Sequence, residues 1–192
     1  MSRAWLMPIL IAFREWGDQH KADPEGPPVL ARHAGCGKDL RVTIAGALAV
    51  GVAVLGATIT DIGPWYRGLA QPRWAPPEAA YGVAWTAIFA FTALGGVTGW
   101  LAMTWREREW LLGLFALNGF LNILWSLLFF RAHRPDWALV EVVLLWVSVA
   151  ALVIVVWRRS MTGAVLLLPY LLWVTFAGYL NMTIVRLNGP FS

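Results

Sequence analysis

Long apolar runs separated by short charged segments dominate the chain from residue 42 onward. A helix needs about 20 residues to cross the hydrocarbon core of a bilayer. We expect spans at residues 42–59, 79–104, 110–130, 137–157 and 163–185. A helix satisfies its own backbone hydrogen bonds in lipid, and these runs lack the alternating polarity of β-barrel strands. The predicted fold is therefore an all-α, polytopic membrane protein with a five-transmembrane-helix bundle.

The composition supports this assignment. Hydrophobic residues make up 59% of the 192 residues and charged residues 14%, whereas a soluble domain has about 45–50% and about 25%. Because so few polar side chains cannot cover a water-facing surface, the apolar excess must face lipid. The chain also has 13 tryptophans, and several, such as Trp105 and Trp157, stand beside charge at the ends of spans, as interfacial anchors do. These features predict an integral, multi-pass membrane protein.

The charge pattern argues against a nucleic-acid partner. The net charge is +4, but the basic residues are spread between apolar runs rather than gathered on one face. Basic residues are more frequent in cytoplasmic loops, so their distribution predicts orientation. Close to the spans, seven arginines and lysines fall on the side of the N-terminus and five on the other, which favours a cytoplasmic N-terminus (Arg32, Lys38, Arg41, Arg106, Arg108, Arg158 and Arg159, against Arg67, Arg73, Arg131, Arg134 and Arg186).

Residues 1–41 differ from the rest of the chain. They hold six basic and five acidic residues, with Pro24, Pro27 and Pro28 close together, so we expect a partly disordered N-terminal extension before a membrane domain at 42–192. The apolar stretch from Trp5 to Phe13 is too short to span a bilayer. Cys36 is the only cysteine, which excludes an intramolecular disulfide, and with His33 it supplies too few ligands for a metal site.

The segment between the first two spans, residues 61–78, is named here the first loop. It is longer than the other loops and carries four prolines among its aromatics. Proline restricts the backbone and lowers the entropy cost of ordering, while aromatics supply contact area. The first loop is expected to act as a lid, and the alternative is that its aromatics only anchor it among lipid headgroups. Its candidate ligand contacts are Trp65, Tyr66, Trp74 and Pro76.

Polar and aromatic residues recur at helical spacing inside the spans. Residues three, four, seven or eight apart share one face of a helix. One face of the third span and matching faces of the second and fifth would together form an aromatic-walled cavity with a few polar points, which is the usual form of a small-molecule site. The faces comprise Asn118, Asn122, Trp125, Ser126 and Phe129; Tyr81, Trp85 and Phe89; and Trp173, Ala177 and Asn181.

Glu141 is the one acid well inside a span, one turn from Trp137. An ionisable group at membrane depth is costly and is a functional hypothesis by default. The alternatives are structural. Glu141 could lie near an interface, the asparagines could only join helices, and Gly95 and Gly99 could bring helices together within the bundle or between subunits.

Several segments together resemble the tryptophan-rich sensory protein/translocator protein family. The first loop has the family's pattern of Trp65-Tyr66, Gln71-Pro72, Trp74 and Pro76-Pro77, with Gln71 where lysine is common. Each later span adds a similar signature, and together they cover about residues 42–188 in order (Trp85-Thr86; Leu121-Asn122, Trp125-Ser126 and Phe129-Phe130; Trp137-Ala138-Leu139 and Glu141; Pro169-Tyr170, Trp173, Ala177 and Leu180-Asn181).

This resemblance implies a five-helix bundle, usually a homodimer, with a pocket under the first loop that binds porphyrins and, in eukaryotic relatives, benzodiazepine-type drugs and cholesterol. Met182 stands where the cholesterol motif of animal relatives has tyrosine, which argues against sterol recognition of that kind. By carry-over, the pocket would be lined or bordered by Trp85, Asn122, Trp125, Ser126, Trp137, Trp173 and Ala177.

The expected ligand is a tetrapyrrole, porphyrin or haem, with no required cofactor, no metal site and no catalytic residues. Tryptophans would stack on the macrocycle, and Arg67 or Arg73 would meet its propionates. His133 is interpreted as a solvated loop residue. Three functions fit these residues: a sensor or carrier, light- or oxygen-dependent porphyrin breakdown with pocket tryptophans as reactive partners, and a membrane scaffold without a ligand.

Overall fold

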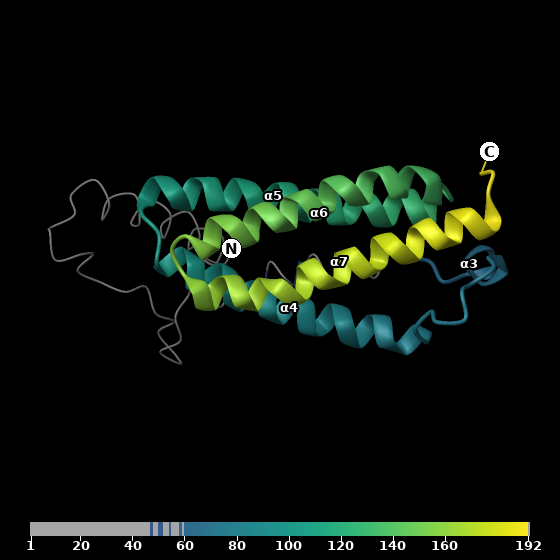
Figure 1. The fold of residues 1–192 in the computed structure, drawn as a ribbon, viewed down its shortest axis with the longest axis horizontal. Helices are drawn as coiled ribbons and strands as arrows, with labels where there is room; N and C mark the ends of the chain where they lie inside the picture. The colour runs from purple at the N-terminus through teal and green to yellow at the C-terminus, as the bar shows by residue number, and fades with distance from the viewer. Residues whose placement is uncertain (1–46, 48–49, 52–53, 55–57, 59, 192) are drawn as a thin grey trace, which may run out of the picture. The chain divides into compact units, whose positions relative to one another are not determined.

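The computed structural model describes residues 47, 50–51, 54, 58 and 60–191, all of which belong to one compact unit, Ala45–Ser192. The described residues form helices and connecting segments, with no strand among them. In Figure 1 these elements are, in chain order, α3 (Pro64–Gly68), α4 (Glu78–Leu101), α5 (Trp105–Ser126), the π-helical turn η2 (Leu127–Arg131), α6 (Pro135–Trp157) and α7 (Met161–Asn188).

The predicted all-α membrane fold is confirmed. Four helical segments of the described chain are long and apolar enough to cross a membrane, namely α4, α5 with η2, α6 and α7. They match the second to fifth predicted spans to within about five residues at each end. The count falls one short of the predicted five, because the first predicted span, 42–59, lies largely outside the described residues. The predicted extension, 1–41, lies wholly outside them and stays a prediction.

Short connections make α5 and α6, and α6 and α7, antiparallel neighbours, while α4 packs mainly on α7. The main contacts join α5 to α6, α6 to α7, and α7 to α4, as Figure 1 shows. Local sequence fixes where the helices begin. Pro135 opens α6, where a missing N–H costs nothing, and the Ser160 side chain accepts a hydrogen bond from the Gly163 amide at the start of α7.

At the end of the bundle that holds the α4–α5 and α6–α7 connections, the helices approach through glycines. A Cβ at Gly95 of α4 would lie 2.8 Å from the Gly163 carbonyl oxygen of α7, and one at Gly99 would lie 3.0 Å from Val156 of α6. Only a residue without a side chain allows this approach. Of the two predicted uses of the Gly95/Gly99 pair, the structure shows the contact within the bundle.

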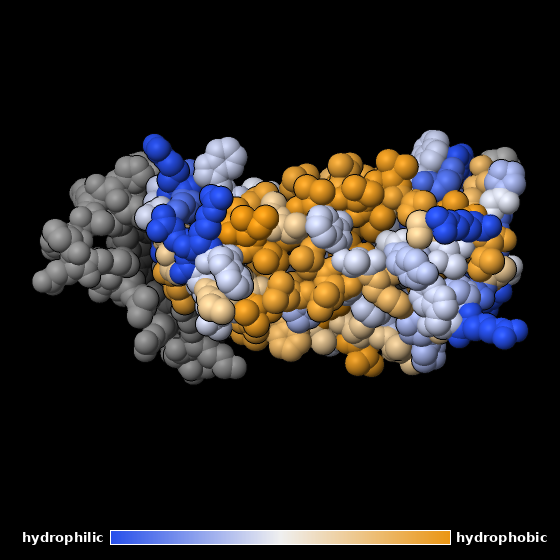
Figure 2. Space-filling model, in the orientation of Figure 1, coloured by the Kyte–Doolittle hydropathy of each residue, from blue (hydrophilic) through white to orange (hydrophobic). Residues whose placement is uncertain are grey.

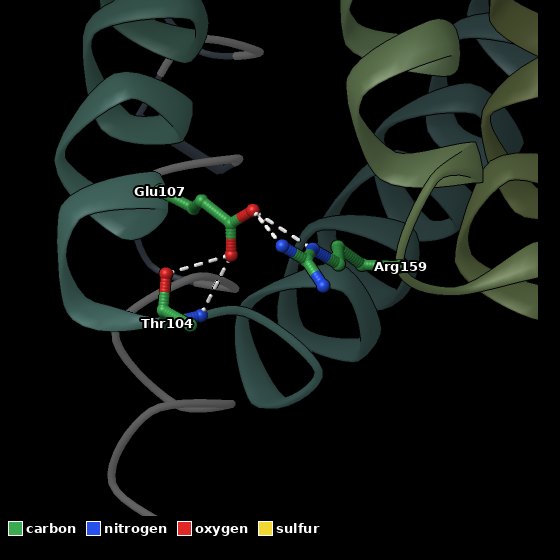
Figure 3. Close-up of polar contacts among 3 residues, drawn as sticks. All are labelled: Thr104, Glu107 and Arg159. Carbon is green, nitrogen blue, oxygen red and sulfur yellow. Dashed lines mark hydrogen bonds and ion pairs between the residues drawn. The ribbon is translucent and has the colours of Figure 1, made fainter.

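The same end carries a polar contact between two connections (Figure 3). The Glu107 carboxylate accepts hydrogen bonds from the Thr104 hydroxyl and backbone amide, at 2.7 and 2.9 Å, at the start of α5. It also accepts two from the guanidinium of Arg159, which lies between α6 and α7, at 2.8 and 2.5 Å. The first turn of α5 is thereby joined to the segment that precedes α7.

The outer surface is apolar along the length of the helices. Figure 2 shows a hydrophobic band on the visible face, between more hydrophilic ends. Large apolar side chains are exposed on all four long helices, as expected for a lipid-facing surface (among them Val83, Phe91, Leu94, Leu112, Phe120, Val140, Val143, Val147, Ile154, Val165 and Leu172).

The π-helical turn η2 interrupts the regular geometry at the end of α5. Its wider turn places the neighbouring residues Phe129 and Phe130 with ring centroids 4.8 Å apart, and both rings contact Trp125. Such turns are rare and recur at functional sites. This one lies where the first loop packs on the bundle.

Candidate ligand-binding site

The first half of the first loop packs on α5 and η2. Helix α3 places Trp65 edge-on to Phe129, with centroids 6.1 Å apart, and Tyr66 against Phe129 and Phe130, at 6.4 and 5.6 Å. These rings join a buried cluster that includes Leu180 and Ile184 of α7. Burial raises the pKa of the Tyr66 phenol. These contacts are made with the helices, as expected for a lid, although Trp74 in the second half remains 44% exposed.

The second half of the first loop is held by α7. Trp74 stacks on Tyr179, with centroids 5.2 Å apart, and meets Phe176 edge-on. The Asn188 side chain accepts a hydrogen bond from the Ala70 amide at 2.7 Å and donates one to the Ala70 carbonyl at 3.1 Å. This two-sided clamp was not predicted. The only sequence signal was an asparagine before Gly189-Pro190, which is typical of a chain turn.

A second group of aromatics lies between α4 and α7. Trp85 stacks on Phe89 within α4, and its ring lies edge-on to Tyr170 and Trp173 of α7, with centroids 6.1 and 6.3 Å apart. Tyr81 contacts Trp173 in the same manner, at 6.0 Å. The predicted aromatic faces of the second and fifth spans therefore do meet.

Polar residues of α5 are joined to α6 and α7 by buried hydrogen bonds. Asn118 donates to Ser148 at 2.9 Å and accepts from the Tyr170 hydroxyl at 3.1 Å, while Asn122 donates to the same hydroxyl at 3.2 Å. Ser148 in turn donates to the Leu145 carbonyl at 2.7 Å. Asn122, predicted as a ligand contact, thus takes part in a network that joins three helices.

Four buried side chains have a polar group that makes no hydrogen bond within the described part of the chain. They are Glu141, through both carboxylate oxygens, Trp125, through its indole N–H, and Tyr81 and Thr92, through their hydroxyls. Glu141 is only 5% exposed and lies in the interior of the bundle, so its side chain does not reach the surface there. A buried polar atom without a partner costs about 1–3 kcal/mol, and each such atom in a native protein calls for an explanation.

Three of the remaining predicted residues lie on the long helices α5 and α7. Ser126 is buried on α5, and Ala177 is half-buried on α7 between Trp173 and Asn181. Asn181 is 1% exposed, and its amide, in the orientation that satisfies its neighbours, donates to the Pro135 carbonyl and accepts from the Leu139 amide. It therefore stabilises the start of α6.

The other two predicted residues, Pro76 and Trp137, lie apart from the ring contacts between the first loop and the helices. Pro76 is half-buried just before α4. Trp137 is 55% exposed and lies under the Arg134 guanidinium, 4.4 Å from its ring centroid. The structure therefore does not bring Trp137 together with the inward-facing aromatics, because its position on α6 turns it away from the buried side of that helix.

The prediction for His133 needs a correction. The residue is exposed, but its ring stacks on Trp65 with centroids 4.2 Å apart and planes 18° from parallel. Its backbone adopts a φ of 55°, in the left-handed region. A solvated histidine was expected because no partner near it in sequence was visible. The partner is supplied by the first loop, about seventy residues earlier in the chain.

No group of three potential metal ligands occurs among the described residues. The fold defines an integral, multi-pass, all-α membrane protein. Aromatic side chains of the first loop meet those of α5, η2 and α7 at one end of it. Residues 43–187 match the model of the TspO/MBR family. The chain belongs to this family.

Individual relatives support the assignment over most of the chain. A tryptophan-rich protein TspO from Chlorobaculum tepidum is 39% identical over 153 residues, which cover 78% of this chain and 95% of that protein. Protein CrtK from Rhodobacter capsulatus is 34% identical over the same shares. The human translocator protein is 33% identical over 126 residues, covering 65% of this chain and 75% of that protein. The resemblance inferred from the sequence motifs is confirmed.

Proposed function

We propose that the protein is a tetrapyrrole-binding membrane sensor or carrier, with its site between the first loop and the aromatic side chains of α4, α5 and α7. One observation carries the proposal. Rings from the loop and from these three elements converge at one end of the bundle, with Trp65 on Phe129, Trp74 on Tyr179 and Trp85 on Trp173. No required cofactor or catalytic residue is part of the proposal.

The chemistry of this region suits a flat, apolar ligand with an anionic edge. Indole and phenyl faces stack on a conjugated ring system. Arg67 and Arg73 are exposed in the first loop, and the ion pair of Arg67 with Glu78 is long, at 3.8 Å, between well-exposed side chains. Such a pair is weak, so Arg67 can turn to a propionate. The name translocator protein, carried by the human relative, accords with a carrier.

The test is ligand binding to purified protein in detergent. Tryptophan fluorescence is titrated with protoporphyrin, haem and a sterol. We expect quenching by the tetrapyrroles, and weaker binding when Trp65, Trp74 and Pro76 are replaced together by Ala. Loss of large apolar contacts should lower the binding free energy by about 1–3 kcal/mol.

Trp110→Ala is the matched control, because Trp110 is 73% exposed near the start of α5 and is remote from the first loop in sequence and packing. It should leave tetrapyrrole affinity unchanged. Equal affinities for the wild type and the triple variant would show that the loop is only an interfacial anchor. The absence of quenching by any tetrapyrrole would reject the proposed function.

A second candidate is light- or oxygen-dependent porphyrin breakdown. It is favoured by the direct contact of Trp85 with Trp173, because an indole is oxidised far more easily than a phenyl ring. For a pure binder, Trp85→Phe and Trp173→Phe should keep affinity within about tenfold. Under light, the bleaching rate of porphyrin bound to either variant should be no lower than that of porphyrin bound to the wild type. Faster bleaching by the wild type at equal occupancy would favour the enzyme.

A homodimer is also proposed, on the family resemblance alone. Light scattering coupled to size exclusion in a detergent of known micelle mass should give twice the monomer mass of 21.3 kDa. A monomer that still binds protoporphyrin would show that the site is complete in one chain.

A further inference from the structure

Two of the unpartnered polar groups, those of Glu141 and Trp125, lie at the same level of the bundle. Trp125 packs against both of the buried clusters nearest the first loop. Along α6, Glu141 stands between Ala138 of one cluster and Val142 of the other. The antiparallel pairing of Asn118 with Ser148 sets the same register. Trp125 follows Asn118 by two turns of α5, and Glu141 precedes Ser148 by two turns of the antiparallel α6. Trp125 and Glu141 are therefore at the same level.

Two of the neighbouring donors are already used. The Tyr170 phenol is near enough to interact electrostatically with Glu141, but its single hydroxyl proton goes to Asn118. The Ser148 hydroxyl donates to the Leu145 carbonyl. The Glu141 oxygens can therefore accept a hydrogen bond from a group outside this network. The Trp125 N–H can donate a hydrogen bond to the same group. Such a group would carry a hydrogen-bond donor beside an acceptor.

A lactam edge has this chemistry, because its N–H donates and its adjacent C=O accepts. A carboxylate ligand does not fit, since it offers no donor and its charge would face the Glu141 carboxylate. The propionates of a tetrapyrrole should therefore stay near Arg67 and Arg73 in the first loop. The opposite edge of the ligand would then reach Glu141 and Trp125. In a macrocyclic protoporphyrin that edge carries vinyl groups, whereas in an open-chain tetrapyrrole it carries two lactam rings.

We propose that Glu141 and Trp125 form a recognition point for a lactam edge, so that the site prefers open-chain tetrapyrroles over the closed macrocycle. The inference rests on the proposed tetrapyrrole function and specifies the ligand class for that site. Glu141 is the acceptor for the lactam N–H, and the Trp125 indole donates to the lactam carbonyl. Stacking is supplied by the surrounding rings and is common to both ligand classes.

The test compares biliverdin, which has two lactams and two propionates, with protoporphyrin, which has the propionates alone. Both are titrated against full-length protein in detergent, and binding is followed by ligand absorbance. The wild type should bind biliverdin more tightly. Glu141→Leu and Trp125→Phe should each weaken biliverdin binding about tenfold, the size expected for losing one buried hydrogen bond. Protoporphyrin binding should change less than about threefold by the same reasoning, since its apolar edge makes no such bond.

Glu141→Gln is the matched control, because its amide oxygen still accepts from an N–H. It should keep most of the biliverdin affinity. A loss with Gln as large as that with Leu would show that charge is needed, as for a cationic ligand, and would overturn the proposal. Equal changes for both ligands in Glu141→Leu or Trp125→Phe would also overturn it while leaving tetrapyrrole binding intact. If neither ligand binds the wild type, the proposed function itself fails.

Folding can be separated from recognition. Removing a buried carboxyl group that has no hydrogen-bond partner should not destabilise the bundle, so Glu141→Leu should melt no lower than the wild type. Trp125→Phe keeps a ring to stack on Phe129, 5.2 Å away in the present structure. If one variant fails to fold, the other still decides between the outcomes.

Discussion

The two ends of the bundle are constructed in opposite ways. At the end that holds the α4–α5 and α6–α7 connections, Gly95, Gly99 and Gly163 bring backbones together, and Glu107 joins two connections through hydrogen bonds. At the other end, large rings separate the helices, and the first loop fills the space above them. Close backbone packing leaves no room for a ligand, whereas rings that meet edge-on can rearrange around one. The comparison assigns rigidity to one end and recognition to the other.

The largest expected effect is at the glycine-packed end. In Gly95→Ala the new Cβ would lie 2.8 Å from the Gly163 carbonyl oxygen and 3.2 Å from Leu167. Helices α4 and α7 would have to separate, which should cost about 3 kcal/mol of stability, at the upper part of the range for overpacking. Thermal unfolding in detergent measures the loss.

Gly113→Ala is the control for this prediction, since nothing lies within 4 Å of a Cβ there. It should be neutral or stabilise the helix by up to about 1 kcal/mol. Folded Gly95→Ala protein should still bind protoporphyrin with wild-type affinity. Weaker binding by the folded fraction would mean that the two ends are coupled, and the division between them would be wrong.

An intermediate effect is expected at the loop-covered end. Asn188→Ala removes both hydrogen bonds to Ala70, which should destabilise the docked first loop by about 1 kcal/mol without lowering the melting temperature of the bundle. Trypsin reports loop release directly, because Arg67 and Arg73 lie in the loop. Cleavage after these residues should become severalfold faster.

Asn188→Asp keeps the acceptor for the Ala70 amide and loses the donor to its carbonyl. Its cleavage rate should therefore fall between those of the wild type and Asn188→Ala. Identical rates for all three proteins would show that ring contacts alone, those of Trp65 and Trp74, hold the first loop in place.

The smallest effect is expected for the exposed contact in Figure 3. The side chains of Arg159 and Glu107 are 48% and 32% exposed, and solvent screens such pairs. Arg159→Ala should lower the melting temperature slightly, and less so as salt is raised. Glu107 keeps its two bonds to Thr104, so α5 should still begin at the same residue. A drop as large as that of Gly95→Ala would show that this contact, rather than glycine packing, secures that end.

Much of the fold could be predicted from the sequence because hydropathy and helix geometry are local properties. The apolar runs located the four described spans, and spacing placed Asn118, Asn122 and Trp125 on one face of a helix. Spacing could not identify the partner of that face. Tyr170 entered only through the family resemblance, and its position between two asparagines depends on how α5 and α7 pack.

The parts of the site that escaped prediction are contacts between segments far apart in the chain. Asn188 binds a backbone group 118 residues away, and His133 meets a ring of the first loop. Trp137 shows the opposite difficulty. A motif placed it beside the pocket, but the rotation of α6 within the bundle decides which way it faces. That rotation is set by Ala138, Val142 and Leu145, which are buried on the other side of the helix.

The π-helical turn at the end of α5 makes the site sensitive to chain length. A π turn holds about one residue more than an α turn, so η2 behaves as a one-residue insertion in a continuous helix. Deleting one residue between Leu127 and Arg131 would restore the α-helix, in which successive residues lie about 100° apart, a wider angle than in the π turn. Phe129 and Phe130 could then no longer both face Tyr66. Two members of the family with the same aromatic residues, but differing by one residue here, would therefore present different surfaces to a ligand.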